Sequence, residues 1–438
     1  MHDDLRGPLT QFSTRSRYLN LNERRDMTNA RPTAGFSLAD PNFWLRTDQD
    51  AAFAQLRRDA PLTWHEEEKS TWFPDGGRGF WSLVRHEDVS LASKDQATFT
   101  SGEGTEIVDL TPSERHIFGG MLNMHAPEHA KYRSIVNRVL TPRTVEAMND
   151  VIDAQAVASI NRVVERGSAD FVEDIVGDYP AQIIGELLSV PTADRAHLID
   201  LTVQALAAYG TKDAYAAYLE IIDYAHQLIA SVRANGSDDN FLGRLLAAEV
   251  DGERMTDQDI AIFFALLLTA GIETTATTLA TGFYGLSLFP DQRAQLQGDF
   301  DVRSAAAVEE LIRWVSPVKH FRRTATRDVE MYGQTIKQGE KVVLWYNSAN
   351  RDESVFELPD NLNLARDPNP QVGFGGGGPH FCLGAVLARK EAVVFLRRLF
   401  EILPDVEVTG EPTFVHSNFV NAVSSLPVSY TARTPLHI

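Results

Sequence analysis

The chain has 438 residues, and its hydrophobic content of 43% with only 23% charged residues can fill a substantial core. Its 60 acidic residues outnumber 41 basic ones, and the net charge of −19 argues against nucleic acid or an anionic membrane as the main partner. The single cysteine, Cys382, excludes an intramolecular disulfide and suits a reducing compartment. There is no apolar signal-peptide segment, and the apolar run over residues 260–272 should be too short to span a bilayer. The sequence therefore predicts a soluble, cytoplasmic protein.

The first part of the chain changes character near residue 36. Residues 1–35 are polar, contain several arginines and lack hydrophobic periodicity, which predicts a loosely ordered leader. Residues 36–438 are expected to form one large domain. It should begin with a short helix over residues 48–59 and two strands over residues 61–66 and 79–84.

Helices dominate from Pro127 onward. Apolar residues recur at three- and four-residue spacing over residues 127–140, 142–165, 179–188, 193–209 and 214–234. Thr256 and Asp259 have the spacing of a helix cap, and they precede the most apolar helix, which should end before Pro290. A further helix at 304–315 is followed by short strands at 329–332 and 341–346. The predicted fold class is mainly α with a minor β-rich part.

The most apolar helix contains an unusual polar stretch, Ala270-Gly-Ile-Glu-Thr-Thr275. Gly271 costs helix stability, about 1 kcal/mol relative to alanine, and Thr274 can hydrogen-bond the carbonyl of Ala270. A buried Glu273 needs a partner or a proton. The stretch is either a tolerated kink with satisfied polar groups, or a groove in which Glu273 and Thr274 deliver protons.

Several charged and imidazole side chains could form a binding site, although each alone is weak support. His129 and Arg133 share one face of a helix that Pro127 helps to start, and with Arg323 and His380 they supply four donors suited to an anion. Glu310 and Arg313 can pair at i,i+3. Such pairs are common on solvated helix faces, where they contribute little to stability.

Cys382 follows a glycine-rich loop and opens a helical segment over residues 383–400. A helix macrodipole favours thiolate over thiol, whereas the ordinary interpretation of a lone cysteine is an inert core residue. Residues 373–378 also fit the glycine fingerprint of dinucleotide-binding proteins. That fingerprint needs a preceding strand in a βαβ unit, and Pro379 argues against it.

Four of these stretches, in this order, resemble the cytochrome P450 family. They are the helix with His129 and Arg133, the stretch Ala270–Thr275, the Glu310-x-x-Arg313 pair and the cysteine loop, and the resemblance extends from about residue 36 to the C-terminus. It implies the cytochrome P450 fold and a haem-thiolate monooxygenase with haem b as cofactor. The implied reaction inserts one oxygen atom of O₂ into a C–H bond.

The resemblance also implies a role for each residue. Cys382 would be the thiolate ligand of the haem iron. The other cofactor-binding residues would be His129, Arg133, Arg323, Phe374, His380 and Gly384. Glu273 and Thr274 would be an acid–alcohol pair that delivers protons for oxygen activation, and Ala270 and Val318 would contact substrate. Glu310, Arg313 and Arg366 would form a buried structural network.

Two positions depart from the family pattern. Gly375 stands where the cysteine loop usually has an aromatic residue, and Phe374 lies one position earlier, so the loop carries one extra residue. His125 stands where an acidic residue often precedes the propionate histidine, and histidine is a poorer helix cap. Neither departure removes an expected haem contact.

The expected substrate is a hydrophobic small molecule of the steroid, branched-lipid or terpenoid class. Residues 98–122, 209–224 and 418–423 are expected to form walls of its pocket. Two electrons would come from a separate ferredoxin and an NAD(P)H-dependent ferredoxin reductase, with a basic patch formed by Arg138, Arg143, Arg389 and Lys390 as the docking site. The alternatives are a haem protein that uses peroxide, and one that senses a ligand without turnover.

Overall fold

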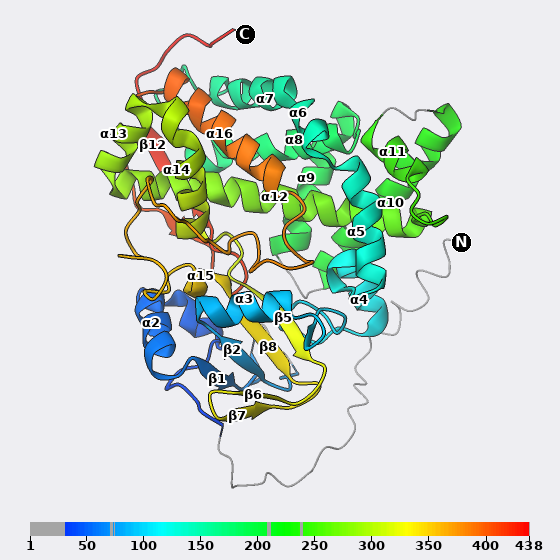
Figure 1. Cartoon of the computed structure of the whole chain (residues 1–438). Coiled ribbons are helices and arrows are strands. Elements are labelled where there is room, and N and C mark those ends of the chain that lie inside the picture. The colour runs from blue at the N-terminus through cyan, green and yellow to red at the C-terminus, as the bar shows by residue number, and fades with distance from the viewer. Residues whose placement is uncertain (1–30, 71–72, 74, 208–211, 237–239, 438) are drawn as a thin grey trace. The chain divides into compact units, whose positions relative to one another are not determined.

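The computed structural model describes residues 31–70, 73, 75–207, 212–236 and 240–437. The predicted leader, residues 1–35, therefore lies almost entirely outside the described residues. Pro32–Ile438 form one compact unit, in which long helices make up one part and a smaller β-rich region makes up the other (Figure 1). The predicted mainly α fold class is confirmed.

A five-stranded sheet forms the centre of the β-rich region. Its strand order is β1 (Leu62–His65), β2 (Phe80–Leu83), β8 (Lys341–Trp345), β5 (His320–Ala325) and β3 (Phe99–Thr100), and only the β2–β8 pairing is parallel. The smaller strands are β4 (Ser168–Asp170), β6 (Val329–Met331), β7 (Gln334–Ile336), β9 (Glu407–Val408), β10 (Thr413–Phe414), β11 (Val423–Ser425) and β12 (Pro427–Ser429). Strand β5 was not predicted.

Helices cover both faces of this sheet, which explains why every residue of β8 is buried. Because side chains alternate along a strand, Val343 packs with α2 (Gln49–Asp59), whereas Val342 packs with α3 (His86–Lys94). Two tryptophan pairs belong to these layers. Trp44 stacks on Trp345 and Trp64 meets Trp81 edge-on, each pair with 5.3 Å between ring centroids.

The helical part largely follows the predicted helices. They are α5 (Glu128–Val139), α6 (Pro142–Glu146), α7 (Asn149–Asn161), α8 (Tyr179–Leu187), α9 (Thr192–Ala207), α10 (Lys212–Asn235), α12 (Asp257–Leu288), α14 (Phe300–Val315) and α16 (Ala385–Ile402). The helix predicted over residues 142–165 is divided into α6 and α7. Helices α3, α4 (Pro112–Gly119), α11 (Phe241–Ala247), α13 (Pro290–Gly298) and the short α15 (Tyr346–Ala349) were missed. A signal for α4 existed in its capping box of Thr111 and Glu114.

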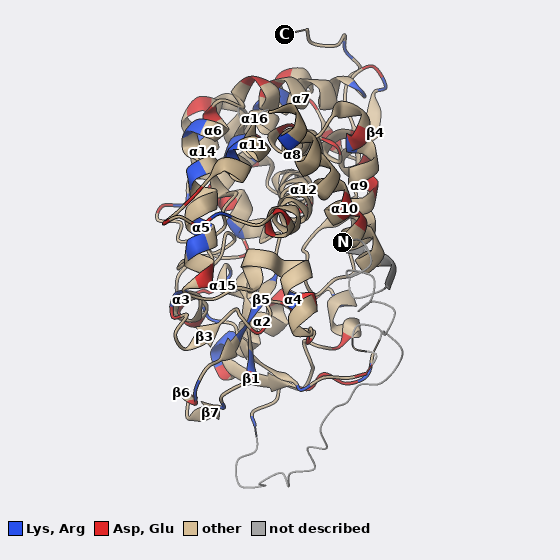
Figure 2. Ribbon diagram, turned by 90° about the vertical axis from the view of Figure 1, so that its right-hand side faces the viewer, with Lys and Arg blue, Asp and Glu red and all other residues tan. Residues whose placement is uncertain are grey.

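Helix α12 runs through the middle of the helical part, and charged residues lie mainly on the helices around it (Figure 2). Its predicted capping box of Thr256 and Asp259 is confirmed. The expectation that its apolar run is too short for a membrane was wrong, because the 32-residue helix is long and apolar enough by length and composition. Most of that apolar stretch is buried inside the protein, as expected for a core helix. The helix is continuous through Gly271, where a Cβ atom would lie 2.8 Å from Ile184 Cδ1 of α8.

The glycine-rich loop before α16 needs its glycines for two reasons. Gly375 and Gly378 have positive φ angles of 97° and 78°, a conformation that glycine adopts without strain. A Cβ atom on Gly378 would also lie 2.5 Å from the carbonyl oxygen of Ser93, at the end of α3. In the described part of the chain, no strand lies between β8 and this loop. The dinucleotide-binding alternative therefore lacks the βαβ unit that it requires.

Candidate functional site

One cavity brings together residues from distant parts of the sequence. It lies between α5, α8, α12, β5, the glycine-rich loop and the start of α16. The predicted site residues that line it are His129, Arg133, Ala270, Thr274, Val318, Arg323, Phe374, His380, Cys382 and Gly384. Among the lining residues described, Glu273 is absent. The structure thus assembles in one place all the side chains expected to bind the cofactor or substrate, but only one of the expected proton-delivery pair.

The Cys382 thiol opens onto this cavity. The cavity leaves its side chain accessible, although protein atoms surround it on its other sides. Burial raises the pKa of the thiol, while the amides of Gly384 and Ala385 and the guanidiniums of Arg133 and Arg389 act in the opposite direction. The helix start therefore favours the thiolate, as predicted, but burial outweighs it. A coordinating metal ion deprotonates such a thiol.

The two histidines at the cavity are neutral rather than cationic. His129 and His380 stack with 4.0 Å between their ring centroids. Burial, together with the nearby positive charges of Arg133 and Arg323, lowers the pKa of His129 to about 4 and that of His380 to about 2. The prediction of four cationic donors is therefore wrong in one respect. Two arginines supply the positive charge, and the imidazoles can donate hydrogen bonds only as neutral rings.

The arginines of the cavity, Arg133 and Arg323, lack anionic partners among the residues that the structure describes. Arg133 donates to the carbonyl of Phe381 at 2.8 Å, and Arg323 donates to that of Arg322 at 2.8 Å. Nε of Arg323 and Nε2 of His380 are buried without a hydrogen-bond partner. Across the residues that the structure describes, no carboxylate forms an ion pair with either arginine. Because an uncompensated buried charge is costly, this arrangement fits a ligand that brings its own negative charges.

The polar stretch of α12 presents Thr274 to the cavity. Its hydroxyl donates to the carbonyl of Ala270 at 2.7 Å, as predicted from the sequence. The Glu273 carboxyl lies on the neighbouring face and hydrogen-bonds to Thr277. Burial raises the pKa of Glu273, which makes the protonated acid more available at neutral pH. The two groups are adjacent in sequence, but only Thr274 faces the cavity directly.

A buried ion network supports the segment that leads into the cysteine loop. Glu310 and Arg313 are both 0% exposed and form two hydrogen bonds of 2.8 Å. Nε of Arg366 lies 3.0 Å from Oε2 of Glu310. Arg313 also donates to the carbonyls of Asn350, Pro359 and Asn361. The network thus joins α14 to residues 350–366.

Sequence reasoning missed Glu391, a carboxyl group that also lines the cavity. The residue is 1% exposed, its Oε1 has no hydrogen-bond partner, and its carboxyl contacts the hydroxyl of Thr275. Burial raises its pKa to about 8, so it is largely protonated at neutral pH. A signal was available, because Glu391 lies between Leu387 and Phe395 at the four-residue spacing of the buried face of α16.

Replacement of Glu391 by glutamine should flatten the dependence of stability on pH. The folded-state pKa of about 8 lies above the ordinary value of 4.5, so the folded protein keeps a proton that the unfolded chain releases between these values. The free energy of unfolding should therefore fall as the pH rises through this range, by about 1.4 kcal/mol per pH unit from this group. Urea unfolding of the holoenzyme at several pH values, followed by far-UV circular dichroism, measures the effect.

Glu401→Gln is a matched control for that experiment, since Glu401 lies on the same helix with its side chain 45% exposed. The control should keep the wild-type pH profile. Parallel wild-type and Glu391→Gln profiles would show that Glu391 is not protonated in the folded protein at neutral pH.

Known proteins resemble this chain along most of its length. The family model described as Cytochrome P450 matches residues 211–302 and 304–420. A methyl-branched lipid omega-hydroxylase of Mycobacterium tuberculosis (strain CDC 1551 / Oshkosh) is 39% identical over 412 residues, covering 91% of this chain and 96% of that protein. A steroid C26-monooxygenase of the same strain is 35% identical over 413 residues, covering 92% and 94%. The chain belongs to the cytochrome P450 family.

A solved structure agrees with this assignment. Cytochrome P450 CYP268A2 of Mycobacterium marinum, in complex with pseudoionone, is 37% identical and has a TM-score of 0.84, covering 92% of this chain and 100% of that chain. The predicted cytochrome P450 fold is thereby confirmed. This cytochrome P450 is an oxidoreductase of the monooxygenase class. Its cofactor is haem, iron protoporphyrin IX, as the sequence resemblance implied.

The cavity of this cytochrome P450 fits that cofactor. An accessible thiol can coordinate iron, and the two arginines without carboxylate partners in the described structure suit the two carboxylates of the porphyrin. The orphan Nε2 of His380 offers a further hydrogen bond to such a group. The donor set thus matches both the metal and the anionic edge of haem.

The walls of the cavity differ from those expected. From residues 98–122 only Met121 and Leu122 line it, and none of the described lining residues comes from 212–224 or 418–423; residues 209–211 lie outside the described residues. Phe419 packs behind a lining residue instead, 5.6 Å from the ring of Phe321. The apolar walls that sequence reasoning missed include Ile184, Leu187, Phe263, Leu266 and Leu267.

Proposed function

We propose that this cytochrome P450 hydroxylates a lipid-like molecule of the methyl-branched lipid, steroid or terpenoid class. The observation that carries the proposal is the apolar part of the cavity wall, formed by Met121, Leu122, Ile184, Phe263, Leu266, Leu267, Val318 and Phe321. Such a surface favours a ligand with extended apolar area. The names of the relatives at 39% and 35% identity support the lipid and steroid classes.

Each residue at the cavity has a proposed role. Cys382 ligates the iron, and Arg133, Arg323 and the two stacked imidazoles, His129 and His380, hold the porphyrin carboxylates. Bound haem supplies the activation of O₂ and the transfer of one oxygen atom to a C–H bond. Phe374 shields the thiolate side, where the guanidinium of Arg389 lies 4.4 Å from its ring centroid. Gly384 lies beside the sulfur, and its amide acts to lower the pKa of the thiol. Ala270 and Val318 contact the substrate.

Protons are delivered from α12 in this proposal. The Thr274 hydroxyl donates a proton into the cavity, and the carboxyl of Glu273, whose pKa is raised by burial, replaces it through water. Before the transfer, the carbonyl of Ala270 accepts a hydrogen bond from this hydroxyl and keeps it at the cavity wall. Glu273 would thus supply protons from outside the described cavity lining, and Thr274 would pass them into the cavity.

Electrons are proposed to come from a ferredoxin and its NAD(P)H-dependent reductase. The predicted docking patch loses one free charge, because Arg389 forms an ion pair with Glu309, whereas the hydrogen bond from Arg138 to the carbonyl of Glu249 at 2.8 Å does not neutralise Arg138. Arg138 and Arg143, which are exposed, and Lys390, which is half-buried, are then the more available positive charges for an acidic ferredoxin. Residues 36–438 are proposed as the catalytic domain, and the cytoplasm as its location.

Thr274→Val should separate substrate binding from turnover. Wild-type holoenzyme with a ferredoxin and reductase should bind and hydroxylate at least one of three probes, namely 15-methylhexadecanoic acid, testosterone and pseudoionone. The variant should bind that probe equally well but form product about 100-fold more slowly, the usual contribution of a positioned proton donor. Soret difference spectra measure binding, and mass spectrometry measures product.

Thr269→Val is the matched control, since Thr269 makes the same type of bond to the carbonyl of Ala265 on α12 but does not line the cavity. It should keep wild-type turnover. Normal turnover of Thr274→Val would exclude this route of proton delivery. Wild-type product formation with hydrogen peroxide, but not with O₂ and reductant, would favour the peroxide-dependent alternative.

A further inference from the structure

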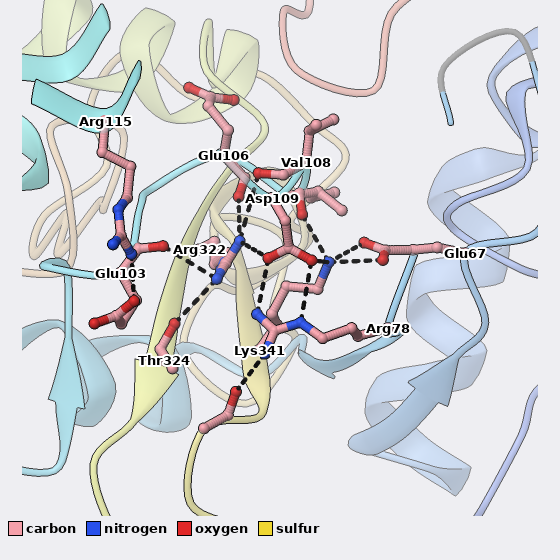
Figure 3. A network of polar contacts seen from close by, with 12 residues as sticks. Glu67, Arg78, Glu103, Glu106, Val108, Asp109, Arg115, Arg322, Thr324 and Lys341 are labelled. Atoms are coloured by element: carbon pink, nitrogen blue, oxygen red, sulfur yellow. Dashed lines mark hydrogen bonds and ion pairs between the residues drawn. The ribbon is translucent and has the colours of Figure 1, made fainter. Parts of the chain in front are cut away.

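Strand β5 presents three consecutive side chains to two different surroundings. Phe321 and Arg323 line the cavity. Arg322, between them, points to the opposite side of the strand, as strand alternation requires, and is 1% exposed. There it joins a buried network of charges that takes no part in the proposed chemistry (Figure 3).

Arg322 holds one short segment, residues 103–109, through several hydrogen bonds. Its backbone amide donates to the carbonyl of Thr105 at 2.7 Å. Its guanidinium donates to the carbonyls of Glu103, Glu106 and Val108 at 3.2, 3.3 and 3.5 Å and to Oδ1 of Asp109 at 2.9 Å. One side chain thus serves acceptors along the whole 103–109 segment. Arginine is suited to this because its five N–H groups form a rigid planar fork.

Lys341 of β8 reinforces the same segment from the neighbouring strand. Its Nζ contacts both carboxylate oxygens of Glu67 and donates to the carbonyl of Ile107 at 2.9 Å and to Asp109 at 3.3 Å. Figure 3 shows Asp109 between Arg322 and Lys341. Although burial opposes it, hydrogen bonding to Arg78 and the charges of Lys341 and Arg322 hold the pKa of Asp109 well below its ordinary value. Asp109 is therefore ionised at neutral pH.

The 103–109 segment is joined in turn to the cavity wall. The hydroxyl of Thr105 donates to Oδ1 of Asn123 at 2.7 Å. Asn123 ends the short 3₁₀ helix η3 (Gly120–Asn123), and the two residues before it, Met121 and Leu122, line the cavity. At the other end of η3, a Cβ atom on Gly120 would lie 2.7 Å from Ile262 Cγ2 of α12, so this wall already packs closely.

We propose that Arg322 is a positioning residue that sets substrate selectivity. It fixes the 103–109 segment, Thr105 transmits that position to η3, and η3 places Met121 and Leu122 against the substrate. The selectivity part rests on the proposed function, since it assumes a lipid-like substrate in this cavity. The structural part concerns only how the 103–109 segment and η3 depend on Arg322.

Two substitutions interrupt this connection at different points. Thr105→Val removes only the hydroxyl that reaches Asn123 and keeps the shape of the side chain, so folding should not be affected. Arg322→Gln removes the guanidinium that donates to Glu103, Glu106, Val108 and Asp109, and keeps the backbone amide that donates to Thr105. Arg78→Gln is the matched control, because Arg78 pairs with the same Asp109 but donates to no carbonyl of the 103–109 segment and is 55% exposed.

Hydrogen–deuterium exchange of the holoenzyme tests the structural part. Amides of η3 should exchange faster in Thr105→Val, and those of both η3 and residues 103–109 should exchange faster in Arg322→Gln. Thr105→Ser and Arg78→Gln should match the wild type. Soret titrations with 15-methylhexadecanoic acid, testosterone and pseudoionone test selectivity. The ratio of the dissociation constant for 15-methylhexadecanoic acid to that for testosterone should change by about tenfold. This is the discrimination that a methylene-sized change in an apolar pocket produces.

Wild-type exchange in η3 for both Thr105→Val and Arg322→Gln would overturn the proposal, as would unchanged probe ratios alongside a lower melting temperature. If wild-type enzyme bound none of the three probes, the proposed substrate class would fail, and the exchange rates would still decide whether Arg322 positions η3.

Discussion

Replacement of Cys382 by serine is expected to abolish both the thiolate-type spectrum of the carbon monoxide complex and monooxygenase activity. The thiolate donates electron density that favours O–O bond cleavage, and a serine hydroxyl is a poor substitute. The fold should persist, because the loop is held by the Cys382 amide, which donates to the carbonyl of Phe374 at 2.9 Å, rather than by the sulfur. Reduced-minus-oxidised spectra under carbon monoxide, product assays and far-UV circular dichroism check these three results.

His380→Gln is the informative control for that experiment. The two stacked imidazoles, His129 and His380, also belong to the described cavity lining, and imidazole is a common metal ligand. The His380 variant should keep the thiolate-type spectrum and bind haem less tightly. A thiolate-type spectrum or activity in Cys382→Ser would mean that another residue ligates the iron.

Replacement of Glu310 by glutamine is expected to cause the largest loss of stability. The change leaves Arg313, which is fully buried, and Arg366, which is 8% exposed, without their shared carboxylate. Removing one partner of a buried ion pair typically costs about 3–5 kcal/mol. The free energy of unfolding, measured by urea titration of the holoenzyme, should fall by this amount, and haem should be lost at lower urea concentration.

The neighbouring Glu309 provides the comparison. Its carboxylate pairs with Arg389 on α16, with side-chain exposures of 28% and 36%. Such a partly solvated pair contributes about 0–1 kcal/mol, so Glu309→Gln should be nearly neutral. Equal losses for the two variants would show that burial of the Glu310 network does not determine its contribution.

The local parts of this fold were predictable because their signals lie within a few residues. The cap of α12 depends on Thr256 and Asp259 alone, and the bond from Thr274 to Ala270 follows from helix geometry. The four family motifs could be found for the same reason. Three of them meet at one cavity, and the Glu310–Arg313 pair lies outside its described lining. This assembly is a property of the fold, which the resemblance implied and single motifs could not establish.

Other features could not be predicted because burial and distant partners decide them. The charge of His129 depends on how deeply it is buried and on Arg323, almost 200 positions later in the chain. Arg322 appears in the sequence as one of two adjacent arginines, and only strand β5 shows that they face opposite sides. The prediction of Glu391 as a cavity residue required knowledge of which face of α16 meets the cavity.

The tryptophan pairs around the sheet give the protein one optical reporter, and the haem gives it a second. Trp44, Trp64, Trp81 and Trp345 are all 4% exposed or less and belong to the β-rich region, whereas the cavity proposed to hold the haem lies mainly among the helices. Four of the six tryptophans lie in this region, so tryptophan emission follows mainly the melting of the sheet, with a contribution from Trp314 on α14. Soret absorbance follows the loss of the cofactor pocket. Superimposable transitions from the two signals indicate that the whole unit unfolds cooperatively, and separate transitions reveal a partly folded state in which one region survives the other.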